Sequence, residues 1–290
     1  MKKIVINTEA NPELSFDKYK KNIDAFIESK QIDKLKLQPD YFEITNNYWI
    51  VDKYIAMNGQ ISLDTFPNTF SAYSQAIKEG YAICIPVQIL DDDNIVCFSH
   101  KSLAKVINST SGYLNKLHLS ELKEINLNDN NEKVPTLDEA LEFIAGKTPI
   151  IIEICNEGMV GKFEDKVLTS LQKYISKYNC YSQVAISSIN PYTLQYCFNQ
   201  FPYITRILKS GNFKEKMFGS IKTKTLKKLK LYKITHADFI CYSAELLPSR
   251  YVTKHKPVGI LASGVNNQNS YLAIAPHADN IIFTNFKPTI

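Results

Sequence analysis

The chain has 290 residues, and its 44% hydrophobic content is enough to build a sizeable core, which excludes a disordered protein. Its 34 Lys and Arg residues against 29 Asp and Glu residues give a net charge of +5, which is too mild to imply nucleic-acid binding by itself. Its 10 glycines form neither of the two common phosphate-binding glycine motifs, so a glycine loop for a nucleotide is excluded.

The six cysteines are scattered and form no C-x-x-C pair, which argues against a zinc ribbon or a disulfide scaffold. Most of them lie within apolar runs, where a free cysteine behaves as a small buried hydrophobe. The first residues lack a signal-peptide core, and no apolar run reaches the roughly 18 residues of a membrane span. We therefore expect a reduced, cytoplasmic protein.

Short apolar runs rich in Ile and Val alternate with amphipathic segments along the chain. Such runs are typical of parallel strands that are covered on both faces. We predict strands over residues 54–59, 83–89, 149–154, 183–189, 204–210, 237–243, 257–262 and 280–285. We expect helices over residues 70–79, 137–144, 163–178, 191–201 and 270–275. This alternation favours a (β/α)₈ TIM barrel.

Two segments depart from the regular alternation. Residues 1–53 form an N-terminal extension, helical in part over 15–29, and the barrel domain is expected over 54–290. After the second strand comes an insertion, with a further apolar run at 95–99 and a polar stretch at 100–134, which we place at the rim of the barrel.

A lysine run at 222–233 holds six lysines and no acidic residue. The favoured interpretation is a solvated helix face whose Leu226, Leu229 and Leu231 help to cover the barrel. The alternative is a surface for anionic lipid or another polyanion.

Several short motifs occur in a fixed order along the chain. Residues 54–59 read Tyr-Ile-Ala-Met-Asn-Gly and are followed by Phe-Pro-Asn-Thr at 66–69. Residues 85–89 read Ile-Pro-Val-Gln-Ile, and His100 follows after a turn. Val-Pro-Thr-Leu stands at 134–137, and Pro-Ile-Ile-Ile-Glu-Ile-Cys-Asn-Glu-Gly stands at 149–158. Ser-Ile-Asn-Pro at 188–191 and Ala-Asp-Asn-Ile-Ile-Phe at 278–283 complete the series. In order and spacing, over about residues 54–286, these segments resemble the glycerophosphodiester phosphodiesterase family.

The resemblance implies a TIM barrel of the phospholipase-C-like phosphodiesterase type and a place in lipid metabolism. It implies hydrolysis of a glycerophosphodiester to glycerol phosphate and an alcohol. In the family, three carboxylates hold Ca²⁺ or Mg²⁺, two histidines act as general acid and base, and an Arg and a Lys stabilise the phosphate.

Carried over position by position, the resemblance implies that most of this set is absent. The first catalytic histidine aligns with Met57, and the two carboxylates of the second strand align with Ile85 and Val87. The phosphate-binding Arg and Lys align with Asn58 and Cys155, the Glu beside that Arg aligns with Pro67, and a late aromatic residue aligns with Ser263.

Two chemical groups remain from the family set. His100 stands at the second catalytic histidine, and Glu153 stands at the third metal carboxylate. A lone carboxylate at the end of an apolar strand needs a partner, and we expect His100 to be that partner. Asn68, Asn190 and Gly59 also match the family, in structural roles.

The leading hypothesis is a pseudoenzyme without a cofactor. One carboxylate cannot replace the six or so oxygen ligands that a hard cation needs, and neither Met57 nor Val87 transfers protons. A mouth lined by Met57, Asn58, Ile85, Val87 and Ser263 would take a weakly polar small molecule or a protein partner.

Two alternatives remain open. One is an active phosphodiesterase that works through His100 without a metal, or through a displaced Ca²⁺ or Mg²⁺ site at Asp91, Asp92 and Asp93. The other is an adaptor that contacts an anionic surface through the lysine run, although peripheral membrane contact is the less favoured interpretation.

Overall fold

The computed structural model describes residues 49–61, 65–105, 112–127, 131–213, 220–255 and 257–289. These residues belong to one compact unit that spans Glu43–Ile290. The helix expected at 15–29 lies outside the described residues, as does most of the N-terminal extension.

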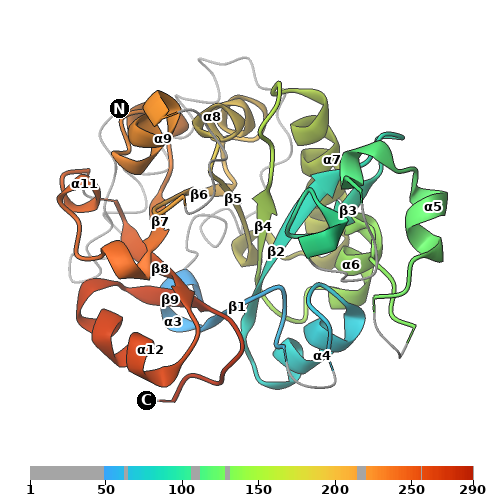
Figure 1. Cartoon of the computed structure of the whole chain (residues 1–290), viewed down its shortest axis with the longest axis horizontal. Coiled ribbons are helices and arrows are strands. Elements are labelled where there is room, and N and C mark those ends of the chain that lie inside the picture. Colours follow the sequence, from blue (N-terminus) through green and yellow to red (C-terminus); the bar gives the residue numbers. More distant parts are fainter. Residues whose placement is uncertain are drawn as a thin grey trace. The chain divides into compact units, whose positions relative to one another are not determined.

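Eight parallel strands close into a barrel (Figure 1). Around the barrel their order is β1-β9-β8-β7-β6-β5-β4-β2, and β1 pairs with β2 to complete the ring. The strands are β1 (Ile55–Met57), β2 (Ala82–Ile89), β4 (Ile150–Ile154), β5 (Val184–Ser188), β6 (Thr205–Ser210), β7 (Phe239–Ser243), β8 (Gly259–Val265) and β9 (Asn280–Phe283). The predicted TIM barrel is confirmed.

The sheet separates two apolar layers, because side chains alternate between the two faces of a strand. Ala82, Cys84 and Ile151 point into the barrel, where they form one buried cluster with residues from the other strands. Ile83 and Ile150 point outward into a larger cluster beneath the surrounding helices. Burial on both sides explains why the strands read as continuous apolar runs.

The outer layer is formed by helices that follow the strands (Figure 1). The helices are α4 (Phe70–Lys78), α6 (Leu137–Ile144), α7 (Lys162–Tyr178), α8 (Pro191–Gln200), α9 (Ser220–Lys227), α10 (Tyr232–Thr235), α11 (Arg250–Thr253) and α12 (Gln268–Ile274). Capping residues define where several of these helices begin. Thr136 and Glu139 form a capping box at α6, and Asn190 caps α8, whose first residue is Pro191.

The insertion after β2 forms a small subdomain at one side of the barrel. Strand β3 (Ile95–Cys97) runs antiparallel to β2, and α5 (Leu119–Glu124) lies farther along the insertion. Two short 3₁₀ helices, Leu103–Lys105 and Leu114–Lys116, lie between them. Apolar residues of the insertion, among them Val96 of β3, Leu103, Leu114 and Leu122, form a separate buried cluster.

The short helix α3 (Trp49–Asp52) closes the barrel at the start of the strands, opposite the mouth. Trp49 and Ile50 belong to the cluster inside the barrel. Asn280 Nδ2 donates to the carbonyl oxygens of Ile50 and Lys53, at 2.7 Å each. The barrel unit therefore begins before residue 54, where the sequence suggested its boundary.

The lysine run at 222–233 forms α9 and the start of α10. Leu226 and Leu229 are buried against the barrel, at 7% and 2% exposure, as the sequence predicted. The lysines Lys222, Lys224, Lys228 and Lys230 are exposed. No helix of the described residues is long and apolar enough to cross a membrane.

Candidate functional site

A buried ion pair occupies the mouth of the barrel, where the carboxyl ends of the strands meet. Glu153 from β4 is 7% exposed. Lys209, from the end of β6, donates to both of its carboxylate oxygens, at 2.7 and 2.6 Å. The partner of Glu153 is thus Lys209, where the sequence suggested His100. The pair is an isolated cation and anion that cancel each other inside the protein.

Electrostatics favour the charged form of Lys209. Burial alone would lower the pKa of Lys209, because it disfavours the ammonium form. The Glu153 carboxylate outweighs that effect, and the pKa of Lys209 is raised well above its ordinary value. Lys209 is therefore protonated throughout the physiological range.

Cysteine thiols from the neighbouring strands surround the ion pair. The Cys84 thiol donates to Glu153 Oε2 at 3.9 Å, and Cys155 follows the carboxylate by two residues. Burial, reinforced by the charge of Glu153, raises the pKa of Cys84 well above its usual value. Burial also raises the pKa of Cys241 to about 11, although Lys209 and Ser263 act in the opposite direction. These thiols are therefore protonated at neutral pH, and a protonated thiol is a weak nucleophile.

The strand register places Ile85 and Val87 away from this mouth. In the β2–β4 ladder, Pro86 pairs with Glu153 and therefore shares its face. Ile85 and Val87 belong instead to the apolar layer beneath the helices. Successive residues of a strand point to opposite faces, so an alignment that is off by one residue places Ile85 and Val87 at the mouth when their side chains point outward. The positions of β2 that face Glu153 are thus Cys84 and Pro86. Neither side chain offers the oxygen ligand that a hard cation prefers.

A polar cluster stands at the end of β1. Met57 is partly buried against the cluster inside the barrel. Asn58 Oδ1 accepts from Ser99 Oγ at 2.9 Å and from Asn68 Nδ2 at 3.2 Å. Two neutral neighbours thus engage the Asn58 amide oxygen. Asn68 has the structural role that the sequence suggested.

His100 lies on the surface after β3, with an exposed side chain. The next residue, Lys101, pairs with Glu157 at 2.8 Å and so links the insertion to the loop after β4. Ser263 is partly exposed in β8, at the same level of the sheet as Ser243 of β7. The mouth positions that remain near the barrel axis are uncharged, apart from the Glu153–Lys209 pair.

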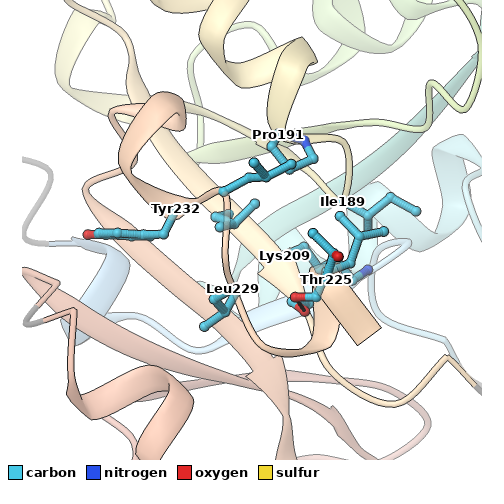
Figure 2. Close-up of a pocket in the computed structure, with 10 residues that line it drawn as sticks. Ile189, Pro191, Lys209, Thr225, Leu229 and Tyr232 are labelled. Carbon is cyan, nitrogen blue, oxygen red and sulfur yellow. Dashed lines mark hydrogen bonds between the residues drawn. The ribbon is translucent and has the colours of Figure 1, made fainter. Parts of the chain in front are cut away.

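A cavity of about 570 Å³ opens beside the mouth, between the loop after β4 and the helices α8 and α9. Its apolar wall includes Val160, Ile189, Pro191 and Leu226. A much smaller cavity of about 10 Å³ adjoins it and reaches Lys209. Figure 2 shows the smaller cavity between β6, α9 and α10. At that volume it holds about one water molecule. None of the site positions inferred from the sequence lines the larger cavity.

A family model described as the glycerophosphoryl diester phosphodiesterase family matches residues 60–249, more than half of the chain. The chain belongs to this family.

Curated relatives carry the same family name. A glycerophosphodiester phosphodiesterase of Caldanaerobacter subterraneus is 28% identical over 137 residues, covering 44% of this chain and 54% of the relative. One from Arabidopsis thaliana is 27% identical over 106 residues, covering 34% of this chain and 32% of the relative. The matches span about half or less of the length of these relatives.

Solved structures share the fold. A phosphodiesterase of Oleispira antarctica, in complex with the product sn-glycerol-3-phosphate, has a TM-score of 0.64 at 19% identity, covering 82% of this chain and 94% of its own. A glycerophosphodiester phosphodiesterase of Thermotoga maritima has a TM-score of 0.58 at 21% identity, covering 79% of this chain and 93% of its own.

The residues at the mouth do not fit the divalent cation that the family implies. A hard cation requires several oxygen ligands and net negative charge. Here the single carboxylate is already neutralised by an ammonium group, and its other neighbours are thiols. Within the described residues, no three His, Cys, Asp or Glu side chains gather as a metal site.

The aspartates after β2 do not supply a displaced site. Asp93 pairs with Lys162 at 2.5 Å. Asp92 accepts from the backbone N–H of Leu119, at the start of α5, at 2.7 Å. Asp91 lies 3.8 Å from His118. The three carboxylates have separate neighbours, two of them in the insertion and one at the start of α7, so they do not converge.

Lys209 is the functional residue that sequence reasoning missed. It stands one residue before the end of the predicted strand at 204–210, on the same face as Thr205 and Ile207. The sequence signal for this ion pair was a single lysine near the end of one predicted strand and a single glutamate near the end of another strand of the same parallel sheet. The ends of parallel strands meet at one edge, so such a pair is a candidate ion pair.

Proposed function

We propose that this chain is a family member without phosphodiester hydrolysis, in which an internal ion pair replaces the metal centre. The proposal rests on the two hydrogen bonds that Lys209 Nζ donates to the Glu153 carboxylate oxygens, at 2.7 and 2.6 Å. An ammonium group in this position supplies positive charge, but it offers no open coordination sites to a phosphodiester.

Phosphate binding is also disfavoured by this arrangement. A phosphate group would have to compete with Glu153 for Lys209, and removal of one partner from a buried pair leaves an uncompensated charge. The remaining residues near the barrel axis, such as Met57, Asn58 and Ser263, are neutral. They favour an uncharged or weakly polar small molecule, or the side chain of a protein partner, as the ligand of the mouth.

The losses are too large for residual chemistry at ordinary rates. A missing general acid or base alone costs about 10²–10⁴ in rate. Met57 cannot transfer a proton, and His100 lies on the exposed side of the mouth. Loss of the electrostatic clamp on the phosphate removes several more kcal/mol, with about 1.4 kcal/mol for each tenfold change in rate.

The direct test is hydrolysis of glycerophosphocholine and glycerophosphoglycerol, assayed with Ca²⁺, with Mg²⁺ and with a chelator. We expect no turnover above the uncatalysed reaction under any of these conditions. Turnover that disappears in both H100A and E153A would overturn the proposal and establish an active phosphodiesterase. A matched control is H277A, since His277 ends the 3₁₀ helix Ala275–His277, which precedes the amino end of β9 and so lies opposite the mouth.

A further inference from the structure

Three positive charges surround one tyrosine ring on the outer layer of the barrel. The Arg250 Cζ atom lies 5.3 Å from the centroid of the Tyr251 ring. The ammonium nitrogens of Lys254 and Lys228 lie 5.8 and 5.9 Å from the same centroid. Any two of the three charges are therefore within about 12 Å of each other, a range over which like charges repel. We call these four residues the Tyr251 cluster.

Two segments of the helical layer meet in the Tyr251 cluster. Arg250 and Tyr251 belong to α11, and Lys254 follows that helix directly. Lys228 follows α9 and belongs to the lysine run at 222–233. The Lys254 Nζ atom lies 3.5 Å from the Lys228 carbonyl oxygen, so the two segments are in contact. The cluster belongs to the helical layer, whereas the Glu153–Lys209 pair lies inside the mouth.

The fold holds the tyrosine ring in place. Tyr251 packs, partly buried, against the apolar layer beneath the helices, and its neighbour Val252 is completely buried. The Ser249 hydroxyl caps α11 and accepts from the Tyr251 backbone N–H at 3.3 Å. Arg250, Lys228 and Lys254 are exposed. The cluster therefore combines a fixed ring with positive charges that a solute can reach.

Carboxylates do not pair with these three cations in the part of the chain that the structure describes. Glu245, five residues before Arg250, keeps its negative charge, but it accepts from Asn212 Nδ2 at 2.6 Å, on the loop after β6. Asp238 lies 3.5 Å from Arg206, just before β7. Each of these two carboxylates thus contacts a residue outside the Tyr251 cluster.

The net field at the Tyr251 hydroxyl is positive even with these carboxylates present. A hydrogen bond from Arg250 is the largest effect, and together with the charges of Lys228, Arg250 and Lys254 it lowers the pKa of Tyr251. A dominant carboxylate would raise that pKa instead. At His255, burial lowers the pKa most, and Lys254 and Lys233 lower it further. Both groups therefore respond to an excess of positive charge.

We propose that the Tyr251 cluster binds a phosphate monoester. Such a group carries close to two negative charges at neutral pH and has three strong acceptor oxygens, so it can accept from a guanidinium fork and two ammonium groups together. A carboxylate or a phosphodiester carries only one negative charge. The arginine gives a planar, bidentate contact that suits phosphate, and the lysines add point charges. The proposal is independent of whether the mouth hydrolyses phosphodiesters.

The test is calorimetric titration of the full chain at low ionic strength with phenyl phosphate, and with dimethyl phosphate as the singly charged diester. We expect saturable binding of phenyl phosphate at one site and much weaker binding of dimethyl phosphate. R250Q should weaken phenyl phosphate binding by about tenfold or more, because it removes the bidentate donor. K228Q and K254Q should each weaken it about twofold to fivefold, as exposed charge pairs do. R250K, which keeps the charge but loses the fork, should fall between R250Q and the unaltered chain.

Two matched controls separate the cluster from general charge and from the mouth. K173Q removes an exposed lysine of α7, and E153L/K209M removes the ion pair of the mouth. Both variants should bind phenyl phosphate as the unaltered chain does.

Vesicles distinguish the two sources of a phosphate monoester. Phosphatidylcholine vesicles with phosphatidic acid present the monoester as a lipid headgroup, and vesicles with phosphatidylglycerol present a phosphodiester at matched surface charge. Co-sedimentation with the first and not with the second would support a lipid headgroup as the ligand. Phenyl phosphate binding without co-sedimentation would support a soluble phosphate monoester.

Three results would overturn the proposal. The first is the absence of both phenyl phosphate binding and selective binding to phosphatidic acid at low ionic strength. The second is binding that R250Q/K254Q leaves unchanged. The third is binding that E153L/K209M abolishes, which would place the phosphate at the mouth of the barrel.

Discussion

Two single residues, Glu153 and Lys209, set the charge at the mouth of this barrel. Glu153 keeps the position that a metal-binding carboxylate would have, but Lys209 holds both of its oxygens. A buried charge is tolerated only when it is paired, so each of the two residues makes the other necessary. The Glu153–Lys209 pair joins the carboxyl ends of β4 and β6 at the mouth.

The coupling of these two residues can be measured. K209M should lower the free energy of unfolding by about 3–5 kcal/mol, because it leaves Glu153 buried without a partner. The double variant E153L/K209M should recover most of that loss, since it removes both charges. Urea unfolding of the two variants checks this, and equal destabilisation in both would show that the pair is not coupled.

The environment of His255 makes the stability of the protein depend on pH. Burial first, and then Lys254, lower the pKa of His255 below its ordinary value. The folded state therefore binds fewer protons than the unfolded state around and below pH 6.5, and stability falls as pH decreases through that window.

We expect the melting temperature to fall between pH 7.5 and 5.5, and to fall less in H255N. The pKa of His236 is also lowered, mainly by burial, so H255N should retain part of the slope. A slope that is unchanged in H255N would contradict the assignment to His255.

At the scale of elements, the turn from β1 into α4 depends on backbone geometry. Gly59 has φ of +83°, and a Cβ atom there would lie 2.7 Å from the Ala72 carbonyl carbon. Gly80, at the end of α4, has φ of +75°, but a Cβ atom there would meet nothing within 4 Å. The two glycines share the left-handed conformation and differ only in the space around them.

G59A should therefore cost more stability than G80A. Strain alone costs about 1 kcal/mol in each, and the clash with the α4 backbone should add about 1–3 kcal/mol in G59A. Thermal or urea unfolding of both variants gives the comparison. Equal losses would show that α4 moves freely to accept the extra atom.

The aspartates of the turn after β2 make separate contacts. Asp92 accepts from the backbone N–H of Leu119 in the insertion, and Asp93 pairs with Lys162 at the start of α7. The displaced metal site that these acids suggested therefore finds no support in their positions.

At the scale of the whole molecule, the absence of a fitting cation site predicts the response to divalent ions. A cation bound with a Kd of about 0.1 mM would stabilise the protein by about 2.7 kcal/mol at roughly 10 mM. That corresponds to a rise of about 5–10 °C in melting temperature for a domain of this size. We expect no such rise with Ca²⁺ or Mg²⁺ and no fall with a chelator.

Differential scanning fluorimetry with and without each ion checks this expectation. Mg²⁺ and Ca²⁺ at equal ionic strength, against NaCl, separate specific binding from screening. A specific shift that E153Q removes would place a cation at the mouth after all.

The sequence by itself determined the fold and the family resemblance. Apolar runs of six or seven residues alternate with amphipathic segments, and α6 has the bounds predicted from its pattern. Such patterns are local, because burial on both faces of a strand or on one face of a helix is written into each segment. The loss of catalytic residue types, such as Met57 in place of a histidine, was equally visible in the chain.

Only the tertiary structure decided which residues share the mouth. Lys209 and Glu153 are 56 positions apart, and the closure of the barrel brings them into contact. The face on which Ile85 and Val87 lie depends on a register that a one-residue ambiguity reverses. Contacts between distant segments follow from how strands are ordered and aligned, and a local pattern does not carry that information.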